Sequence, residues 1–223
     1  MKKIQLLQQI RDAGVVAVLR GSSAEQVALM AEKAIEGGIR IIEITMTVPQ
    51  ACEAITELTK TYQSEDPSGE KYAVIGSGTV LDAETARATL LAGAEFVVSP
   101  SLDEATVRLC NRYGVPVLPG AMTVKEITSA MELGVDVVKL FPGNLYSPSI
   151  IPTLRGPLPQ ANLMPTGGVN LENLQDWVAA GAFAVGIGSD LTKEALASGD
   201  FSLITQKAEA YMAAFRKAAA GRY

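Results

Sequence analysis

The residue of this chain with the clearest chemical potential is Lys139, which lies in a predominantly apolar run from Val135 to Pro142. Burial among apolar neighbours disfavours the charged form of a lysine, and a neutral amine is a nucleophile that attacks ketone and aldehyde carbons. The chain has ten lysines, and Lys139 is the one with apolar residues close on both sides. The pattern indicates Schiff-base chemistry. A lysine at a strand end that extends its amine to water would produce the same local sequence.

A second ionisable residue, Glu43, interrupts another apolar run between Ile42 and Ile44. A carboxyl group in a buried strand must be hydrogen-bonded, ion-paired or protonated. Burial raises the pKa of a carboxyl group, and such a group can move protons near pH 7. If Glu43 and Lys139 face one cavity, we predict that Glu43 is the acid and base that serves the amine. An ion pair without chemistry is the structural alternative.

Three further candidates follow apolar runs. Arg20 ends the first run, and its guanidinium can bind a carboxylate or a phosphate through two parallel hydrogen bonds. Thr79 follows Gly76-Ser77-Gly78 and offers a hydroxyl beside glycines that permit a tight turn and a close approach of ligand. Phe141 could form a wall that keeps Lys139 dry. A surface arginine, a plain turn and core packing are the corresponding structural interpretations.

Two glycine-rich segments lie near the end of the chain, Pro165-Thr166-Gly167-Gly168 and Gly186-Ile187-Gly188-Ser189. Each follows a predicted strand, the seventh and the eighth. Loops in these two positions of a β/α barrel commonly bind phosphate, together with the start of a short helix. We therefore predict that backbone N–H groups of Gly167, Gly168 and Ser189 bind an anion.

The composition excludes several kinds of chemistry and partner. The chain has no histidine, which removes Ser-His-Asp and Cys-His nucleophile systems and histidine-based zinc sites. Cys52 and Cys110 lack metal-ligand spacing, so we expect no metal and a reduced, cytoplasmic protein. The net charge is −5 without a basic stripe, which argues against nucleic acid. The longest apolar runs fall short of the roughly 20 residues that span a bilayer, so we expect no membrane partner.

Strands and helices alternate along the whole chain. Several of the apolar runs are continuous rather than alternating, which is typical of parallel strands covered on both faces. Eight strands are predicted: Val15–Arg20, Arg40–Thr45, Tyr72–Gly76, Glu95–Ser99, Pro116–Leu118, Asp136–Leu140, Asn162–Met164 and Phe183–Ile187.

Helix start and stop signals separate these strands. Ser22, Ser101 and Thr123 each have a glutamate three residues later, as in a capping box, and Asp82 can cap the helix that follows it. Glycines stand where four helices should end, at Gly93, Gly114, Gly134 and Gly181.

Eight strand–helix units predict one (β/α)8 TIM barrel over residues 1–223, preceded by a helix at Ile4–Ala13 and closed by a helix at Phe201–Ala219. An open doubly wound sheet is the alternative. It usually carries a Gly-rich phosphate loop after the first strand, and Arg20-Gly21-Ser22-Ser23 is not such a loop. In a barrel, functional side chains lie at the carboxyl ends of the strands, where the candidates above fall.

The motifs together resemble a known family, the bifunctional 2-dehydro-3-deoxy-phosphogluconate (KDPG) aldolase / 4-hydroxy-2-oxoglutarate (KHG) aldolase family. The likeness extends over roughly residues 10 to 215. The matching segments, in order and in spacing, are Glu43-Ile44-Thr45, Gly76-Ser77-Gly78-Thr79-Val80, Ser99-Pro100, Val138-Lys139-Leu140-Phe141-Pro142, Pro165-Thr166-Gly167-Gly168 and Gly188-Ser189.

The resemblance implies a (β/α)8 class I aldolase, usually a homotrimer, that needs no metal or other cofactor. Lys139 corresponds to its Schiff-base lysine and Glu43 to its proton-shuttling acid and base. Many members carry an arginine four residues after this glutamate, where the present chain has Thr47. The other implied contacts are Arg20 and Thr79 at the carboxylate end of the substrate, Pro100 and Phe141 in the pocket wall, and Gly167, Gly168 and Ser189 at the phosphate.

The implied substrate is a phosphorylated 2-keto-3-deoxy acid, cleaved to pyruvate and glyceraldehyde 3-phosphate. Cleavage of KHG to pyruvate and glyoxylate, and action on the galactonate epimer, are the neighbouring expectations. A sugar-phosphate isomerase or epimerase is the alternative enzyme, since it would use the same phosphate loops with an acid/base pair. A non-catalytic phosphate-binding barrel is the third interpretation.

Overall fold

The computed structural model describes residues 1–62, 64–69 and 71–220. Across these residues every strand pair is parallel, in a six-stranded sheet of order β5-β4-β3-β2-β1-β9 and a three-stranded sheet of order β6-β7-β8. The strands are β1 (Val15–Leu19), β2 (Ile41–Thr45), β3 (Val74–Gly78), β4 (Val97–Val98), β5 (Val117–Leu118), β6 (Gly120–Ala121), β7 (Val138–Leu140), β8 (Leu163–Pro165) and β9 (Val185–Ile187). The predicted α/β class with parallel strands is confirmed.

The two sheets curl toward each other, and contacts link them at both edges. At one edge, β5 and β6 are consecutive pieces of the chain on either side of Pro119, whose carbonyl accepts a hydrogen bond from the Lys139 N–H at 2.9 Å. Proline has no N–H to donate, which interrupts the ladder between β5 and β6, and the predicted fifth strand, Pro116–Leu118, covers β5 alone. At the other edge, an isolated parallel bridge joins Thr166, just after β8, to Gly186 in β9.

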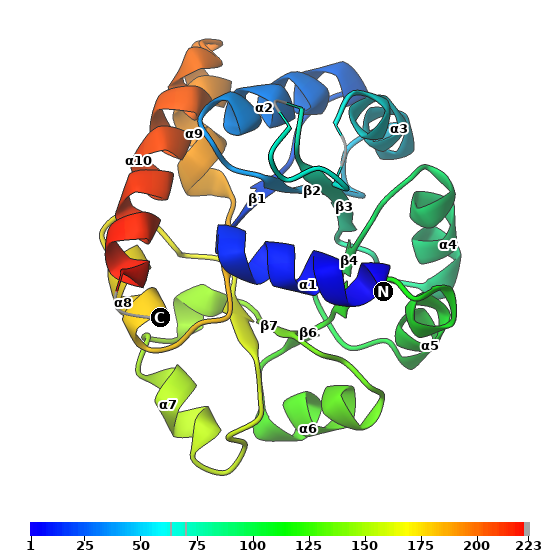
Figure 1. Ribbon diagram of the computed structural model, residues 1–223, viewed down its shortest axis with the longest axis vertical. Coiled ribbons are helices and arrows are strands. Elements are labelled where there is room, and N and C mark those ends of the chain that lie inside the picture. Colours follow the sequence, from blue (N-terminus) through cyan, green and yellow to red (C-terminus); the bar gives the residue numbers. More distant parts are fainter. Residues whose placement is uncertain (63, 70, 221–223) are drawn as a thin grey trace.

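Helices surround these strands in a ring, and α1 lies across the middle of that ring (Figure 1). The N-terminal and C-terminal helices form where the sequence predicts them. The helices are α1 (Lys2–Ala13), α2 (Ala24–Glu36), α3 (Ala51–Thr61), α4 (Ala83–Leu91), α5 (Glu104–Tyr113), α6 (Val124–Glu132), α7 (Ile150–Arg155), α8 (Leu174–Ala179), α9 (Ser189–Ser198) and α10 (Ser202–Ala219), with a 3₁₀ turn η1 (Gly143–Leu145). None of the described helices has the length and apolar character needed to cross a bilayer.

The helix ends show which local signals were read correctly. Thr123 forms the predicted capping box, Asp82 caps α4, and all four predicted stop glycines have a positive φ. Two start predictions were wrong. Ser23 rather than Ser22 caps α2, and Asp103 rather than Ser101 caps α5, where its carboxylate accepts from both the N–H and the hydroxyl of Thr106.

The apolar core consists of two separate clusters. The larger cluster lies between the strands and the surrounding helices. The smaller cluster fills the inside of the curled sheet with side chains from the strands and from the residues next to them, and Leu6 and Ile10 of α1 join it. Helix α1 therefore closes one end of this interior. The interior residues are Leu6, Ile10, Val16, Ile41, Val74, Phe96, Val98, Leu118, Val137, Met164 and Ala184.

The polar residues of the interior follow from the two-residue period of a strand. Side chains two positions apart point to the same face. Ile41 and Val137 belong to the interior cluster, so Glu43 and Lys139 face inward as well, one step further from α1. The strands thus deliver both side chains to the end of the interior that α1 leaves open.

Candidate active site

Lys139 and Glu43 meet inside the curled sheet, although they come from strands that are not neighbours. Lys139 lies in β7 between Gly120 of β6 and Met164 of β8, and Glu43 lies in β2 opposite Gly76 of β3. The Nζ atom of Lys139 is 3.7 Å from Oε1 of Glu43, and the two side chains are only 4% and 0% exposed. The amine and the acid thus contact each other on the inner face of the strands, as the two-residue period of a strand predicts.

Glycines in β3 make room for this arrangement. A Cβ atom at Gly78 would overlap the Glu43 carboxyl group, and one at Gly76 would overlap the ring of Phe96. The predicted third strand, Tyr72–Gly76, ends too early, and the close approach predicted at its glycines is made by protein groups rather than by a ligand. The strand continues to Gly78, because glycines are needed where the carboxyl group and the ring press against the backbone.

The Glu43 carboxyl group is buried and polar but has no fixed hydrogen-bond partner among the described residues, on either oxygen. Burial raises its pKa above the ordinary value, and the positive charges of Lys139 and Arg20 oppose that shift. A carboxyl group with a raised pKa and free oxygens can exchange protons with a bound molecule. A raised pKa is what the proton-transfer role predicted for Glu43 requires.

A cavity of about 950 Å³ opens beside Lys139. Six of the nine predicted site residues line it, and Phe141 forms part of its wall with the ring centroid 5.0 Å from the Lys139 amine. Glu43 adjoins it through the contact with Lys139. The predicted residues in the lining are Arg20, Lys139, Phe141, Gly167, Gly168 and Ser189.

Thr79 and Pro100 are not among the described residues that line this cavity. Thr79 follows Gly78 directly and is half-buried in a left-handed conformation with φ 56°. The carbonyl of Pro100 packs against Gly120, which pairs with Lys139. Thr79 is therefore the sequence neighbour of the glycine that contacts Glu43, and Pro100 packs behind the strand that pairs with Lys139. Neither residue is part of the cavity wall.

Arg20 lies at the exposed rim of the cavity, beside Thr47. Its Nη1 atom donates to Oγ1 of Thr47 at 3.5 Å, and Thr47 contacts Thr45 at 2.8 Å. The Thr45 hydroxyl in turn donates to the carbonyl of Leu19 at 3.0 Å. The guanidinium that follows β1 is thus linked to the end of β2 through Thr47 and Thr45.

Thr166 is a functional candidate that the sequence analysis missed. Its side chain lines the cavity and is buried, and its Oγ1 atom has no hydrogen-bond partner among the described residues. A free buried hydroxyl is costly unless a ligand satisfies it. The signal was available, because Met164 faces the interior and Thr166 is two residues further along.

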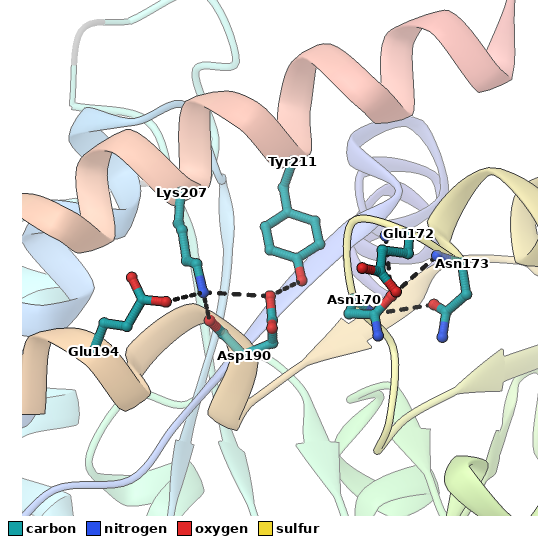
Figure 2. Close-up of polar contacts among 7 residues, drawn as sticks. All are labelled: Asn170, Glu172, Asn173, Asp190, Glu194, Lys207 and Tyr211. Carbon is teal, nitrogen blue, oxygen red and sulfur yellow. Dashed lines mark hydrogen bonds and ion pairs between the residues drawn. The ribbon is translucent and has the colours of Figure 1, made fainter. Parts of the chain in front are cut away.

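One wall of the cavity is a pair of backbone loops. Gly167 and Gly168 have left-handed φ values of 90° and 76°. The loop after them is held by side chains, since Asn173 Nδ2 donates to the Gly168 carbonyl at 2.8 Å. The Asn170 N–H donates to Asn173 Oδ1 at 3.0 Å (Figure 2). The Asn173 N–H in turn donates to Asn170 Oδ1 at 3.0 Å. These contacts fix the glycine backbone beside the cavity.

The second loop of this wall ends at the start of α9, where Ser189 is the first helical residue and lines the cavity. The first turn of a helix leaves N–H groups without partners in the helix and carries a partial positive charge. Two loops with available N–H groups and a cationic rim at Arg20 together suit an anionic ligand.

A parallel α/β fold with a buried lysine amine, an adjoining free carboxyl group and an anion-binding wall defines a class, the lysine-dependent aldolases. The comparisons with known proteins identify the group within it. The family model "KDPG and KHG aldolase" matches residues 6–207, and this chain belongs to that family.

Individual relatives agree with this assignment. A 2-dehydro-3-deoxy-phosphogluconate aldolase of Treponema pallidum is 34% identical over 204 residues, which are 91% of this chain and 93% of the relative. A 2-dehydro-3-deoxy-6-phosphogalactonate aldolase of Escherichia coli is 32% identical over 205 residues, 92% of this chain and 95% of the relative. A solved KDPG aldolase from Legionella pneumophila, with pyruvate captured as a covalent carbinolamine, has a TM-score of 0.81, 28% identity, and 92% and 97% coverage of the two chains.

Proposed function

We propose that this chain is a class I aldolase that cleaves 2-dehydro-3-deoxy-6-phosphogluconate to pyruvate and glyceraldehyde 3-phosphate. The observation that carries the proposal is the Lys139 amine, buried beside a cavity and 3.7 Å from a free carboxyl group. An isomerase or epimerase would need an acid/base pair but no buried amine, and a binding protein would need neither.

The first half of the reaction forms the covalent bond. Lys139 passes a proton to Glu43, and the neutral amine attacks the C2 ketone. Glu43 then moves one proton to the former carbonyl oxygen and another from nitrogen to the departing hydroxyl, so that one water leaves and an iminium remains. Glu43 ends this stage as a carboxylate, and its unpartnered oxygens can follow the proton from atom to atom.

The second half breaks the carbon–carbon bond. Glu43 accepts the proton of the C4 hydroxyl, the C3–C4 electron pair moves toward the iminium, and glyceraldehyde 3-phosphate leaves. The resulting enamine takes a proton at C3 from Glu43. One water then hydrolyses the iminium and releases pyruvate, and Lys139 returns to the ammonium form in which the cycle began. Each proton that Glu43 accepts is returned, so enzyme and substrate balance over the cycle.

The remaining predicted residues bind the substrate in this proposal. The backbone at Gly167, Gly168 and Ser189 binds the phosphate, and Phe141 excludes water from the amine. Arg20 binds the substrate carboxylate, helped by Thr79, while Pro100 and Gly120 shape the backbone behind Lys139. Thr166 adds its free hydroxyl.

Two related reactions belong to the same proposal. The galactonate epimer is favoured by the likeness to a phosphogalactonate aldolase. Cleavage of KHG to pyruvate and glyoxylate is the second, since the family description includes that activity.

We further propose that the two sheets form one closed eight-strand barrel, with β5 and β6 as two parts of a single strand. The bridge between Thr166 and Gly186 and the chain continuity at Pro119 support closure. We propose a homotrimer, as the family resemblance implies. Met122, Val124 and Leu145 are exposed apolar side chains, and the Tyr146 hydroxyl bonds the carbonyl of Met122, which supports an apolar contact surface there. Free Cys52 and Cys110 are consistent with a reduced cytoplasmic compartment.

Borohydride reduction in the presence of pyruvate tests the proposed function. A stable pyruvate adduct on Lys139, located by peptide mass spectrometry, is the expected result. Reduction that leaves Lys139 unmodified would refute the Schiff-base mechanism. Retro-aldol rates on the two C4 epimers and on a phosphate-free substrate then establish which substrate is preferred.

A further inference from the structure

Helix α10 contributes two side chains to the anion-binding wall from outside the sheet. Lys207 and Tyr211 extend from α10 toward the first turn of α9, as Figure 2 shows. Lys207 lines the cavity, while Tyr211 is fully buried. None of the proposed catalytic steps uses either residue.

Both side chains bind one residue, Asp190, through different atoms. The Lys207 ammonium donates to the Asp190 carbonyl at 2.6 Å and lies 3.7 Å from its Oδ2 atom. The Tyr211 hydroxyl donates to the same Oδ2 atom at 2.5 Å. Glu194, one turn further along α9, adds a contact to Lys207 at 3.4 Å. Asp190 is therefore held at its backbone and at its side chain.

The position of Asp190 makes these contacts consequential. It follows Ser189 directly, in the first turn of α9, and is one of the residues that line the cavity. A carboxylate is favourable for the helix at this end but repels a phosphate bound there. The Tyr211 hydroxyl and the Lys207 ammonium reduce the negative potential that the Asp190 carboxylate exerts on the cavity. The carboxylate itself stays at the start of the helix, where its charge is favourable.

We propose that Lys207 and Tyr211 are positioning residues for the phosphate-binding turn, which they hold through Asp190. The inference rests on the proposed function, because it assigns the anion at this wall as the substrate phosphate. Neither residue touches the reacting atoms. Their effect is on how firmly the N–H groups of Gly188 and Ser189 are presented and on how much negative charge the phosphate meets.

The test compares phosphorylated with phosphate-free substrate in Tyr211→Phe, Lys207→Met and Lys207→Arg. Tyr211→Phe keeps the buried ring and removes only the hydroxyl, and Lys207→Arg keeps the charge and the donors. We expect Tyr211→Phe and Lys207→Met to raise KM for the phosphorylated substrate roughly tenfold, the effect of one lost hydrogen bond to a charged group. The loss on phosphate-free substrate should be at least five-fold smaller, and Lys207→Arg should restore most of the affinity.

Lys3 provides a matched control. Its amine contacts Asp136 at 2.8 Å, and its side chain is 23% exposed, as is that of Lys207. Lys3 lies in α1, at the end of the molecule that the cavity does not reach. Lys3→Met should leave the ratio of the two substrates unchanged. An equal loss on both substrates in the α10 variants would overturn the positioning role, as would no loss on either.

Binding of inorganic phosphate, measured by calorimetry, separates this inference from the proposed function. Weaker phosphate binding in Tyr211→Phe and Lys207→Met is expected whether or not the protein cleaves an aldol. A wild type that binds phosphate but forms no borohydride adduct would refute the proposed function and leave the positioning role in place. Equal phosphate affinity in wild type and variants would refute the positioning role even if the adduct forms.

Discussion

The two halves of the cavity treat polar groups in opposite ways. Around the amine, Glu43 and Thr166 have buried oxygens without a hydrogen-bond partner among the described residues. Along the wall formed by the loops after β8 and β9, Asn170, Asn173 and Asp190 each bind neighbouring side chains or backbone. Polar groups in the first half are available to a ligand, whereas those in the second half form hydrogen bonds within the protein.

The difference teaches what each half requires. A group that moves protons must be free to bind different atoms as the reaction proceeds. A wall that binds an anion through backbone N–H groups needs those groups fixed in advance, and side-chain contacts supply the rigidity. The presence or absence of hydrogen-bond partners within the protein thus distinguishes the supporting residues of this cavity from the residues proposed to react.

The largest effect is expected from Lys139→Met, which removes the nucleophile from the half that reacts. Aldol cleavage should fall by on the order of 10⁶-fold, as when a covalent nucleophile is deleted elsewhere, and no borohydride adduct should form. The measurement is pyruvate release with a coupled assay. Lys125→Met, in exposed α6, is the matched control and should retain full activity. Substantial cleavage by Lys139→Met would exclude the Schiff base.

Glu43→Gln tests the acid that adjoins the amine. The amide keeps the shape but cannot carry a proton, so kcat should fall by about 10²- to 10⁴-fold, the usual contribution of a general acid or base. Adduct formation on Lys139 should become slower but should still occur, which single-turnover trapping would measure. Glu84→Gln, on the exposed surface of α4, is the control. An unchanged kcat would assign proton transfer to another group.

Thr166→Val sharpens the contrast between free and bonded hydroxyls. Because the Thr166 hydroxyl has no partner, its removal should leave the free energy of unfolding unchanged or raise it by about 1 kcal/mol. Substrate affinity should fall roughly tenfold. Thr89 is the opposite case, since its buried hydroxyl contacts Ala86 and Ser77 at 2.9 Å each. Thr89→Val should destabilise the protein by about 1 to 2 kcal/mol with activity retained. Chemical denaturation measures stability, and steady-state kinetics measures substrate affinity. Lost stability in Thr166→Val together with lost activity in Thr89→Val would contradict the prediction.

The smallest effect concerns the dependence of stability on pH. The Glu43 pKa is raised by burial above its ordinary value of 4.5, so the folded protein holds this proton more tightly than the unfolded chain. That contribution to stability is fully present below pH 4.5 and is lost as the pH rises through the folded-state pKa. The stability of wild type relative to Glu43→Gln should therefore decline with rising pH, by at most about 1.4 kcal/mol per unit. Urea denaturation at several pH values measures the slope, and a rising difference would contradict the assignment.

The chemistry-bearing strands could be predicted from sequence because their pattern is local. Lys139 and Glu43 stand two residues after apolar interior positions, and that period alone places both on the inner face. The contact of Lys207 with Asp190 could not be predicted in the same way. It joins two helices, and their relative rotation depends on how each packs on the sheet rather than on any motif. The groups that pack against the β3 glycines could not be predicted for a similar reason, since they come from distant parts of the sequence.

Helix α1 has a consequence for the order of events. Because Leu6 and Ile10 fill the far end of the interior, the cavity beside Lys139 opens at the end opposite α1, next to the loops that carry Gly167, Gly168 and Ser189. In the proposed mechanism, pyruvate remains bonded to Lys139 while the aldehyde occupies the cavity between that bond and the solvent. The aldehyde must depart first, and a new ketone can enter only after the keto acid has followed it out. The two products therefore leave the cavity in a fixed order.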